Sequence, residues 1–214
     1  SGSCGGTLVA SGTSSVIVSP AAATTYYVRA QGTCNTTSCV STTVNVNTQS
    51  TAPGSITPTS SLICNGQSTT LTANGATLGT GGVLQWYSGS CGGTSVGTGN
   101  SISISPTATT TYYVRAEDPA PCNTLTSCAS TTITVNQPSI APTTISGVST
   151  ICIGGTTTLT VADGSLGTGA TWQWYSNSCG GGSVGSGPSI TVSPISNTTY
   201  YVRAEGPVHA VRQP

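Results

Sequence analysis

Cysteine is the residue type with the clearest chemistry in this sequence, since nine cysteines occur among 214 residues. Cysteines in this number either bind a metal or form disulfides, and disulfides persist in oxidising compartments. Zinc sites use closely spaced cysteine pairs or interleaved histidines. Here the close pairs are Cys34 with Cys39 and Cys122 with Cys128, and the single histidine is His209. The pattern therefore predicts disulfides rather than a metal or another cofactor, and a location outside the cell or in a periplasm.

The ionisable side chains are too few and too scattered to predict an enzyme. Because His209 stands in an atypical tail, no Ser–His–Asp triad is expected. Glu117 and Asp118 are adjacent, so on a strand they would point to opposite faces and could not form an acid/base pair. The formal net charge is zero, which gives no basic surface for nucleic acid. No apolar run is long enough for membrane insertion.

Two sequence blocks recur at a nearly constant interval and define the organisation of the chain. Ser-Cys-Gly-Gly begins at Ser3, Ser90 and Ser178, so that its cysteines lie 87 and 88 residues apart. Thr-Thr-Tyr-Tyr-Val-Arg-Ala occurs at 24–30, 110–116 and 198–204. A period of about 88 residues is too long for a solenoid unit and matches an immunoglobulin-like sandwich. The expected fold is therefore all-β, with tandem immunoglobulin-like β-sandwich repeats stapled by disulfides.

The repeats divide the chain into three expected units. Residues 1–49 hold the last four strands of a repeat, 50–137 form a complete repeat, and 138–214 form a repeat that lacks its last strand. An isolated half-sandwich would leave its core face and sheet edges open. We therefore interpret the chain as an excerpt from a longer array, with strand exchange between subunits as the alternative.

Alternation along the predicted strands assigns the core. Thr, Val and Ile favour strands, and Gly, Asn and Pro separate them. The complete repeat is expected to have strands at 55–62, 68–73, 83–88, 94–97, 101–105, 110–117 and 129–136. In 110–117, Arg115 needs water, which places Tyr112 and Val114 inward. In both longer repeats the expected core comprises Leu71, Trp86, Tyr112, Val114, Leu159, Trp174, Tyr200 and Val202.

The predicted topology also suggests how the cysteines pair. Cys64 begins the second strand and Cys91 follows the third, at one end of the sandwich, while Cys122 and Cys128 flank a hairpin at the other end. Two alternatives stay open: a bridge between neighbouring repeats, such as Cys64 to the hairpin of the third repeat, and Cys64 with Cys128 if the strand directions differ. The predicted bridges are Cys64–Cys91, Cys122–Cys128, Cys34–Cys39 and Cys152–Cys179. Only Cys4 is left over, and its partner is expected in the missing start of its own repeat.

One arginine and one outward tyrosine recur in every repeat. The arginines are Arg29, Arg115 and Arg203, and the tyrosines are Tyr27, Tyr113 and Tyr201. The interpretation we favour is a solvated strand face, with Arg115 near Glu117 in a weak exposed pair. The alternative is a periodic contact to a ligand such as a glycan, or to another filament.

Several motifs of the complete repeat together carry a resemblance to a known family. They are Cys91-Gly-Gly-Thr, Gly97-Thr-Gly, Ser105-Pro-Thr, Thr111-Tyr-Tyr-Val-Arg-Ala-Glu, Cys122-Asn and Ser127-Cys-Ala. The combination resembles the Ig-like repeats of very large Bacteroidetes cell-surface adhesins, and it covers nearly all of the chain except 207–214. The resemblance implies export to the cell surface by the type IX pathway, a stalk or filament of many repeats, and no catalytic residues.

Two functions are therefore expected as alternatives. The first is a stalk or filament segment of an extracellular bacterial surface adhesin, acting as a stiff spacer, because short Pro-bearing linkers at 51–58 and 137–144 would join the repeats semi-rigidly. The second is a glycan- or matrix-binding adhesive module that uses the Arg/Tyr face. The expected partners are neighbouring repeats of the same chain, with other filament subunits or surface glycans as alternatives.

The tail at 207–214 breaks the repeat where a cysteine-rich hairpin is due. Back-translation of this segment with one nucleotide skipped gives codons compatible with Cys-Thr-x-Cys-Ala-Ser, which resembles 122–130. A frameshift in the source sequence is our hypothesis for this segment, and resequencing of the gene tests it.

Overall fold

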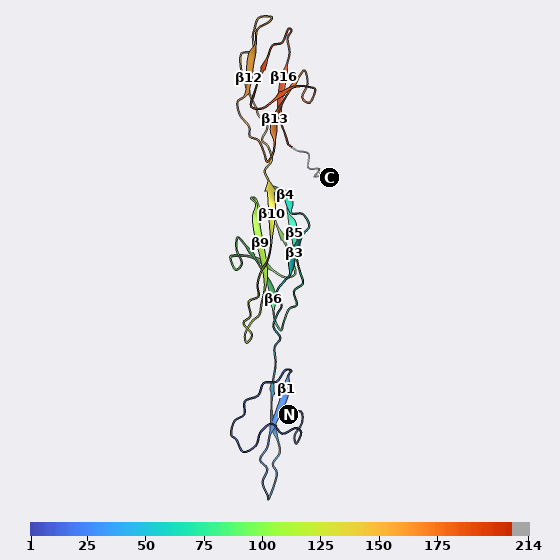
Figure 1. Cartoon of the computed structure of the whole chain (residues 1–214), viewed down its shortest axis with the longest axis vertical. Coiled ribbons are helices and arrows are strands. Elements are labelled where there is room, and N and C mark those ends of the chain that lie inside the picture. Colours follow the sequence, from blue (N-terminus) through green and yellow to red (C-terminus); the bar gives the residue numbers. More distant parts are fainter. Residues whose placement is uncertain (207–214) are drawn as a thin grey trace.

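The computed structural model describes residues 1–206, and the frameshift hypothesis for 207–214 lies outside them. Within this range every regular element is a β-strand, and no helix could span a membrane. Figure 1 shows three units arranged end to end in an elongated molecule, with the N-terminal unit at one end. We call them repeat 1 (1–49), repeat 2 (50–137) and repeat 3 (from 138). The predicted all-β fold with tandem immunoglobulin-like repeats is confirmed.

Repeat 2 is a complete sandwich of two sheets. One sheet is antiparallel and has the order β3-β5-β8, formed by β3 (Ser55–Pro58), β5 (Thr69–Asn74) and β8 (Ser101–Ile104). The other has the order β4-β10-β9-β6-β7, formed by β4 (Leu62–Cys64), β10 (Ala129–Asn136), β9 (Thr110–Glu117), β6 (Val83–Ser88) and β7 (Thr94–Thr98). Alternate residues of the central strands face the space between the sheets.

The expected first strand at 55–62 is in fact two strands that belong to different sheets. β3 pairs with β5, whereas β4 runs parallel to β10. Pro58 ends β3 because it has no N–H to continue the ladder. The chain then bends around the buried Thr69, whose hydroxyl accepts a hydrogen bond from the Ser60 N–H at 3.1 Å. The sequence prediction of one strand missed this transfer between sheets.

The core of repeat 2 is built around Trp86, whose side chain is completely buried. Leu71 and Val114 are also fully buried, and Tyr112 is 5% exposed. The indole N–H of Trp86 donates to the carbonyl of Gly99 at 2.8 Å, so the buried donor has a partner. Each of the four core residues expected in this repeat therefore lies between the two sheets.

Repeat 3 forms all three strands of the smaller sheet but only three of the five strands of the larger sheet. Its sheets have the orders β11-β12-β15 and β14-β13-β16. Their strands are β11 (Ile145–Ser146), β12 (Thr157–Val161), β13 (Thr171–Ser176), β14 (Gly182–Ser186), β15 (Ser189–Val192) and β16 (Tyr200–Glu205). The segment equivalent to β4 is not a strand, because β4 pairs with β10 and the described part of repeat 3 has no equivalent of β10.

The missing partner leaves a groove in repeat 3 where repeat 2 is closed. Trp174 is completely buried, as Trp86 is. Leu159 and Tyr200 are only half-buried and line a groove of about 640 Å³ with Ile195. Val202, which the sequence also placed in the core, is half-buried. The core of repeat 3 is thus less complete than the core of repeat 2.

Repeat 1 has fewer strands than the sequence suggested. Of the four expected strands, only β1 (Thr24–Val28) and β2 (Val40–Val44) form, as an antiparallel pair. In repeat 2 the other two types of strand, β7 and β8, pair with β6 and β5. Residues 1–49 contain no equivalents of β5 and β6, so these segments have no ladder to join.

The difference between the two cores predicts the effects of two equivalent substitutions. Leu71→Ala should lower the free energy of unfolding of repeat 2 by about 2–5 kcal/mol, because it opens a cavity in a closed core. Leu159→Ala should lower that of repeat 3 by clearly less, because Leu159 already borders an open groove. Hydrogen–deuterium exchange resolved by peptide measures each repeat separately. A larger loss of protection for Leu159→Ala than for Leu71→Ala would contradict this account.

Candidate functional site

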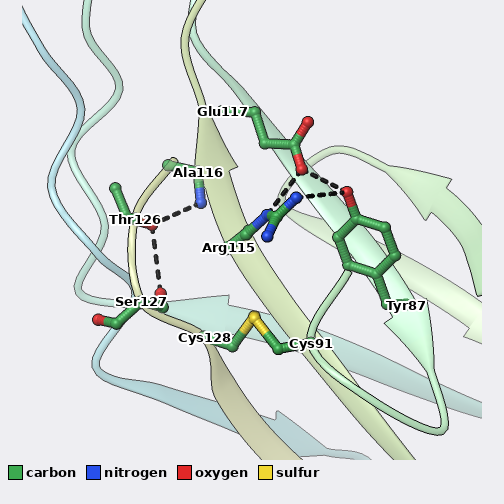
Figure 2. Close-up of a disulfide and its surroundings, with 8 residues drawn as sticks. All are labelled: Tyr87, Cys91, Arg115, Ala116, Glu117, Thr126, Ser127 and Cys128. Atoms are coloured by element: carbon green, nitrogen blue, oxygen red, sulfur yellow. Dashed lines mark hydrogen bonds and ion pairs between the residues drawn. A yellow bond between two sulfur atoms is a disulfide. The ribbon is translucent and has the colours of Figure 1, made fainter. Parts of the chain in front are cut away.

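The recurring arginine lies in a polar cluster on the outer face of the larger sheet of repeat 2. β9 and β6 pair so that Arg115 and Glu117 lie beside Tyr87. The Arg115 Nε donates to Glu117 Oε1 at 2.7 Å, and its Nη2 donates to the Tyr87 hydroxyl at 3.3 Å. The Tyr87 hydroxyl in turn donates to Glu117, and the guanidinium lies 5.1 Å from the Tyr87 ring centre. Figure 2 shows this closed set of contacts.

Repeat 3 reproduces the cluster with Tyr175, Arg203 and Glu205. The Arg203 Nε donates to Glu205 Oε1 at 2.6 Å, and the guanidinium lies 5.0 Å from the Tyr175 ring centre. In repeat 1, Arg29 donates instead to the side-chain amide of Gln31 at 3.5 Å. The arginine is therefore engaged by a side chain two positions along the strand in all three repeats.

The contacts in the cluster alter its ionisation. Desolvation alone would raise the pKa of Glu117, but the hydrogen bonds from Tyr87 and Arg115 outweigh it and lower that pKa. Burial and the hydrogen bond to Glu117 raise the pKa of Tyr87. The hydrogen bond to Glu117 is the main cause of a raised pKa for Arg115. The cluster therefore favours an ionised Glu117 and a neutral Tyr87, which suits a fixed ion pair and not a proton donor.

A disulfide lies beside this cluster and corrects the predicted cysteine pairing. Cys91 bonds to Cys128, 37 residues further along, and Cys4 bonds in the same way to Cys39 in repeat 1. The predicted bridges Cys64–Cys91, Cys122–Cys128 and Cys34–Cys39 were wrong, as was the prediction that the partner of Cys4 lies outside this chain. The predicted bridge Cys152–Cys179 is also absent, since both are unpaired among the described residues.

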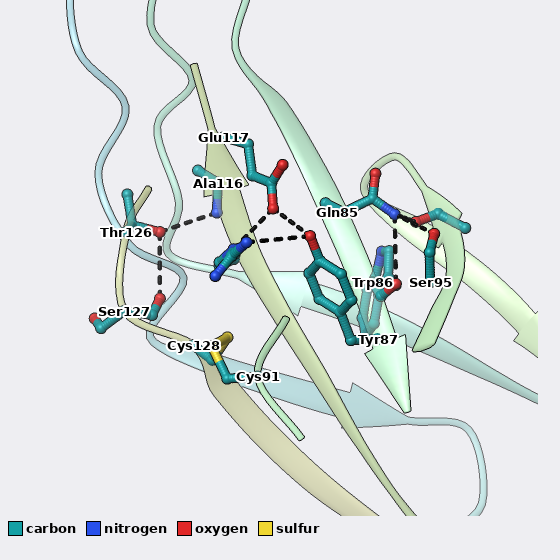
Figure 3. Close-up of polar contacts among 12 residues, drawn as sticks. Gln85, Trp86, Tyr87, Cys91, Ser95, Ala116, Glu117, Thr126, Ser127 and Cys128 are labelled. Carbon is teal, nitrogen blue, oxygen red and sulfur yellow. Dashed lines mark hydrogen bonds and ion pairs between the residues drawn. A yellow bond between two sulfur atoms is a disulfide. The ribbon is translucent and has the colours of Figure 1, made fainter. Parts of the chain in front are cut away.

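The turn after β6 explains why the predicted pairing failed. The sequence places Cys91 at the end of β6, near Cys64, but the turn folds back over the outer face of the sheet. Gly92, at φ +78°, lies so close to the Arg115 guanidinium that a Cβ there would be 3.3 Å from Nη1. The turn thereby brings Cys91 to Cys128, the residue directly before β10. Figure 3 shows the two cysteines bonded to each other. Cys64 is level with Asn136, at the far end of β10.

The remaining residues of the predicted binding face differ in exposure. Tyr27 is 38% exposed and Tyr201 is 36% exposed, while Tyr113 is half-buried beside Tyr87. Tyr87 and Tyr175 are buried at 8% exposure because the cluster covers them. The described residues contain no group of three or more side chains suited to a metal ion. On this face Tyr113 lies opposite Tyr87 and Tyr201 lies opposite Tyr175, and the arginine of each repeat lies over the ring of the buried tyrosine.

Asp118 contributes a further contact that the sequence did not suggest. Its carboxylate accepts a hydrogen bond from the Ser50 N–H at 2.8 Å and another from the Ser50 hydroxyl. These bonds, the hydroxyl's first, lower the pKa of Asp118. Ser50 begins repeat 2, so the contact fastens the incoming chain to the end of β9. Ser50 and Asp118 are 68 residues apart in the sequence, so no local pattern predicted their contact.

The fold and the disulfides define a class of protein, namely disulfide-stapled immunoglobulin-like repeats. The profile of the family described as "Ig-like domain CHU_C associated" matches residues 51–137 and 138–209. The chain belongs to this family, which confirms the resemblance to Ig-like repeats of Bacteroidetes cell-surface proteins. No curated protein matches the chain.

Among solved structures, the chain is similar to the crystal structure of the chicken CNTN1 FN1–FN3 domains. The sequence identity is 9% and the TM-score is 0.28. The match covers 84% of this chain and 68% of that chain. A likeness this distant carries no argument about function.

The disulfide predicts a difference between two kinds of cysteine substitution. Replacing both Cys91 and Cys128 by alanine should lower the free energy of unfolding of repeat 2 by about 4 kcal/mol, because the unfolded chain is freed from its cross-link. Cys64→Ala should leave it nearly unchanged, since Cys64 is exposed and unpaired. Urea unfolding of the oxidised chain measures both. If Cys64→Ala lowered the free energy of unfolding by the same amount, the result would support the Cys64–Cys91 bridge expected from the sequence.

The lowered pKa of Glu117 predicts a pH dependence. Ionised Glu117 stabilises the fold fully above its unfolded pKa of about 4.3, and this stabilisation is lost as the pH falls through the lower folded value. Glu117→Gln should therefore cost about 1 kcal/mol at pH 7 and clearly less at pH 3. Urea unfolding followed by Trp86 fluorescence, with Trp172 and Trp174 replaced by phenylalanine, measures the difference. A cost that does not change with pH would contradict the ion pair.

Proposed function

We propose that this chain is a segment of a stiff stalk that spaces other parts of an extracellular bacterial surface protein from the cell. The observation that carries the proposal is the way in which each repeat is fastened to the next. In the connection between β2 and β3, residues 48–54 are held by hydrogen bonds to repeat 2. A stalk needs such junctions, because its length is useful only if its repeats do not fold back on each other.

Both junctions use the same pair of hydrogen bonds. At the first, the Thr48 N–H donates to the Thr80 hydroxyl at 3.1 Å, and the Thr80 N–H donates to the Thr48 carbonyl at 3.0 Å. At the second, the Gln137 N–H donates to the Thr168 hydroxyl at 2.9 Å, and the Thr168 N–H donates to the Gln137 carbonyl at 3.0 Å. The linker is thus paired in each case with a loop of the following repeat.

A glycine at each junction allows this close approach. A Cβ on Gly79 would lie 2.2 Å from the Thr48 carbonyl oxygen, and one on Gly167 would lie 2.2 Å from that of Gln137. The Gly79 N–H also donates to the Ser50 hydroxyl at 2.9 Å, and the Gly167 N–H donates to that of Ser139 at 2.9 Å. Only a residue without a side chain fits between linker and loop at these positions.

The state of the Arg/Tyr face supports a spacer over the alternative of glycan binding. Arg115 and Arg203 are each held by a glutamate and a tyrosine of their own repeat. A glycan would have to displace those partners to reach the guanidinium. The repeats of this family and the disulfides point to an extracellular or cell-surface protein.

The test of the spacer is a substitution that opens a junction without touching a core. In small-angle X-ray scattering, the intact chain should behave as a rigid particle several times longer than wide. Gly79→Ala should shorten its mean length and broaden its distance distribution, because the added methyl group forces linker and loop apart. Gly54→Ala is the matched control, since a Cβ there meets its nearest atom at 3.8 Å.

The outcomes separate the two functions. A wild-type chain that is as flexible as the Gly79→Ala variant would contradict the stalk. Binding to immobilised glycans that is lost on Tyr113→Ala, with the length unchanged, would support the adhesive module instead.

A further inference from the structure

Five cysteines have no partner within the described residues, and they fall into three structural types. Cys34 and Cys122 occupy the hairpin before the last strand, and Cys179 matches Cys91. Cys64 is the last residue of β4, and Cys152 holds the equivalent position in repeat 3. The partner of a Cys179-type residue is known from Cys91–Cys128. The other two types have no such explanation within a single repeat, where they lie at opposite ends of the sandwich.

The hairpin type lies at the junction with the preceding repeat. The Cys122 thiol is half-buried and lies 3.8 Å from the carbonyl oxygen of Asn47. Asn47 is the residue immediately before Thr48, whose pairing with Thr80 fastens repeat 1 to repeat 2. Cys122 therefore contacts the last residue of the preceding repeat before the junction.

The second type lies at the junction with the following repeat. Cys64 is level with Asn136 in the parallel pair of β4 and β10. The Asn65 N–H donates to the Asn136 carbonyl at 2.9 Å, and the Asn65 side chain donates to Gln137 at 2.9 Å. Parallel strands lie about 4.8 Å apart. The exposed Cys64 therefore lies about one strand spacing from Asn136, at the end of its own repeat.

Asn47 and Asn136 are the same position in successive repeats. Each directly precedes the residue that forms the pair of hydrogen bonds at the junction, Thr48 in one case and Gln137 in the other. Since both junctions share this pair of hydrogen bonds, a Cys122-type residue of the next repeat would lie against Asn136 as Cys122 lies against Asn47. The thiol of that residue and the thiol of Cys64 would then both lie next to Asn136.

We propose that Cys64-type and Cys122-type residues of successive complete repeats form a disulfide across the junction. The bridge would join the end of one sandwich to the hairpin of the next, beside the hydrogen-bonded linker. Two thiols lose two protons and two electrons to form one S–S bond. A small-molecule disulfide such as oxidised glutathione accepts them and is reduced to two thiols.

This inference goes beyond the spacer function and does not depend on it, since a cross-link between repeats would serve an adhesive array equally well. It also assigns a role to each unpaired cysteine. Cys34 and Cys122 would bond backwards, Cys64 and Cys152 would bond forwards, and Cys179 would bond within its own sandwich.

The test is to give Cys64 a complete following repeat within the full chain. Copying residues 48–136 in place, directly after Asn136, joins two complete repeats through the junction sequence that follows Asn47. The protein is folded with oxidised glutathione, the monomer is isolated on a non-reducing gel, and its chymotryptic peptides are mapped by mass spectrometry. We expect a peptide that links Cys64 to Cys122.

Variants of single copies identify the two residues in that link. Cys64→Ala in the first copy should abolish the linked peptide, whereas Cys64→Ala in the second copy should leave it intact. The chain without the duplication should not contain it. Loss of the link in the second-copy variant, its absence from the monomer, or its presence only in disulfide-bonded dimers would each overturn the proposal. Scattering data from the same proteins report the stiffness separately.

Discussion

Filling a sandwich interior without phenylalanine or methionine is the constraint on which the rest of this structure depends. In repeat 2, Trp86 supplies the volume that several smaller residues would otherwise have to provide. Its indole N–H needs a partner inside the sandwich, and the Gly99 carbonyl provides one at 2.8 Å. Trp174 and Gly187 repeat the contact at 2.9 Å. With the tryptophan fixed, β6 and β9 must pair in one register, and that register places the outer cluster.

The outer cluster then follows from the same pair of strands. The side chains of β9 that do not pack on Trp86 point to the other face, where Arg115, Glu117 and Tyr87 satisfy one another. The turn that carries Cys91 lies over the guanidinium and reaches Cys128. A small core is thereby reinforced by a covalent bond and a local ion pair on its outer face. These side chains make their hydrogen bonds and ion pairs within the repeat, and for this reason the recurring arginine supports a structural role.

The junctions extend the same economy of side chains to the space between repeats. They use backbone groups, threonine hydroxyls and glycines, so their geometry depends on hydrogen-bond direction and close approach. Hydrogen bonds of this kind are directional, which supports the proposed stiffness of the stalk. Asp118 adds a charged acceptor to the first junction, while Gly206 stands at the corresponding place in repeat 3. The two junctions therefore share their backbone pairing but differ in this carboxylate.

The sequence by itself determined the length of the repeat, the all-β class and the inward positions of repeat 2. Repetition and alternation can be read directly from the order of the residues. Tyr112 and Val114 could be placed inward from the needs of Arg115 alone. Only the tertiary structure decided which cysteines meet, since the turn at Gly92 folds back over the sheet and reverses the end at which Cys91 lies. It also decided that Leu159 borders a groove, because its burial requires an equivalent of β10, which the described part of repeat 3 lacks. Contacts between residues far apart in sequence, such as Ser50 with Asp118, depend on how the strands are assembled, and no local pattern records that assembly.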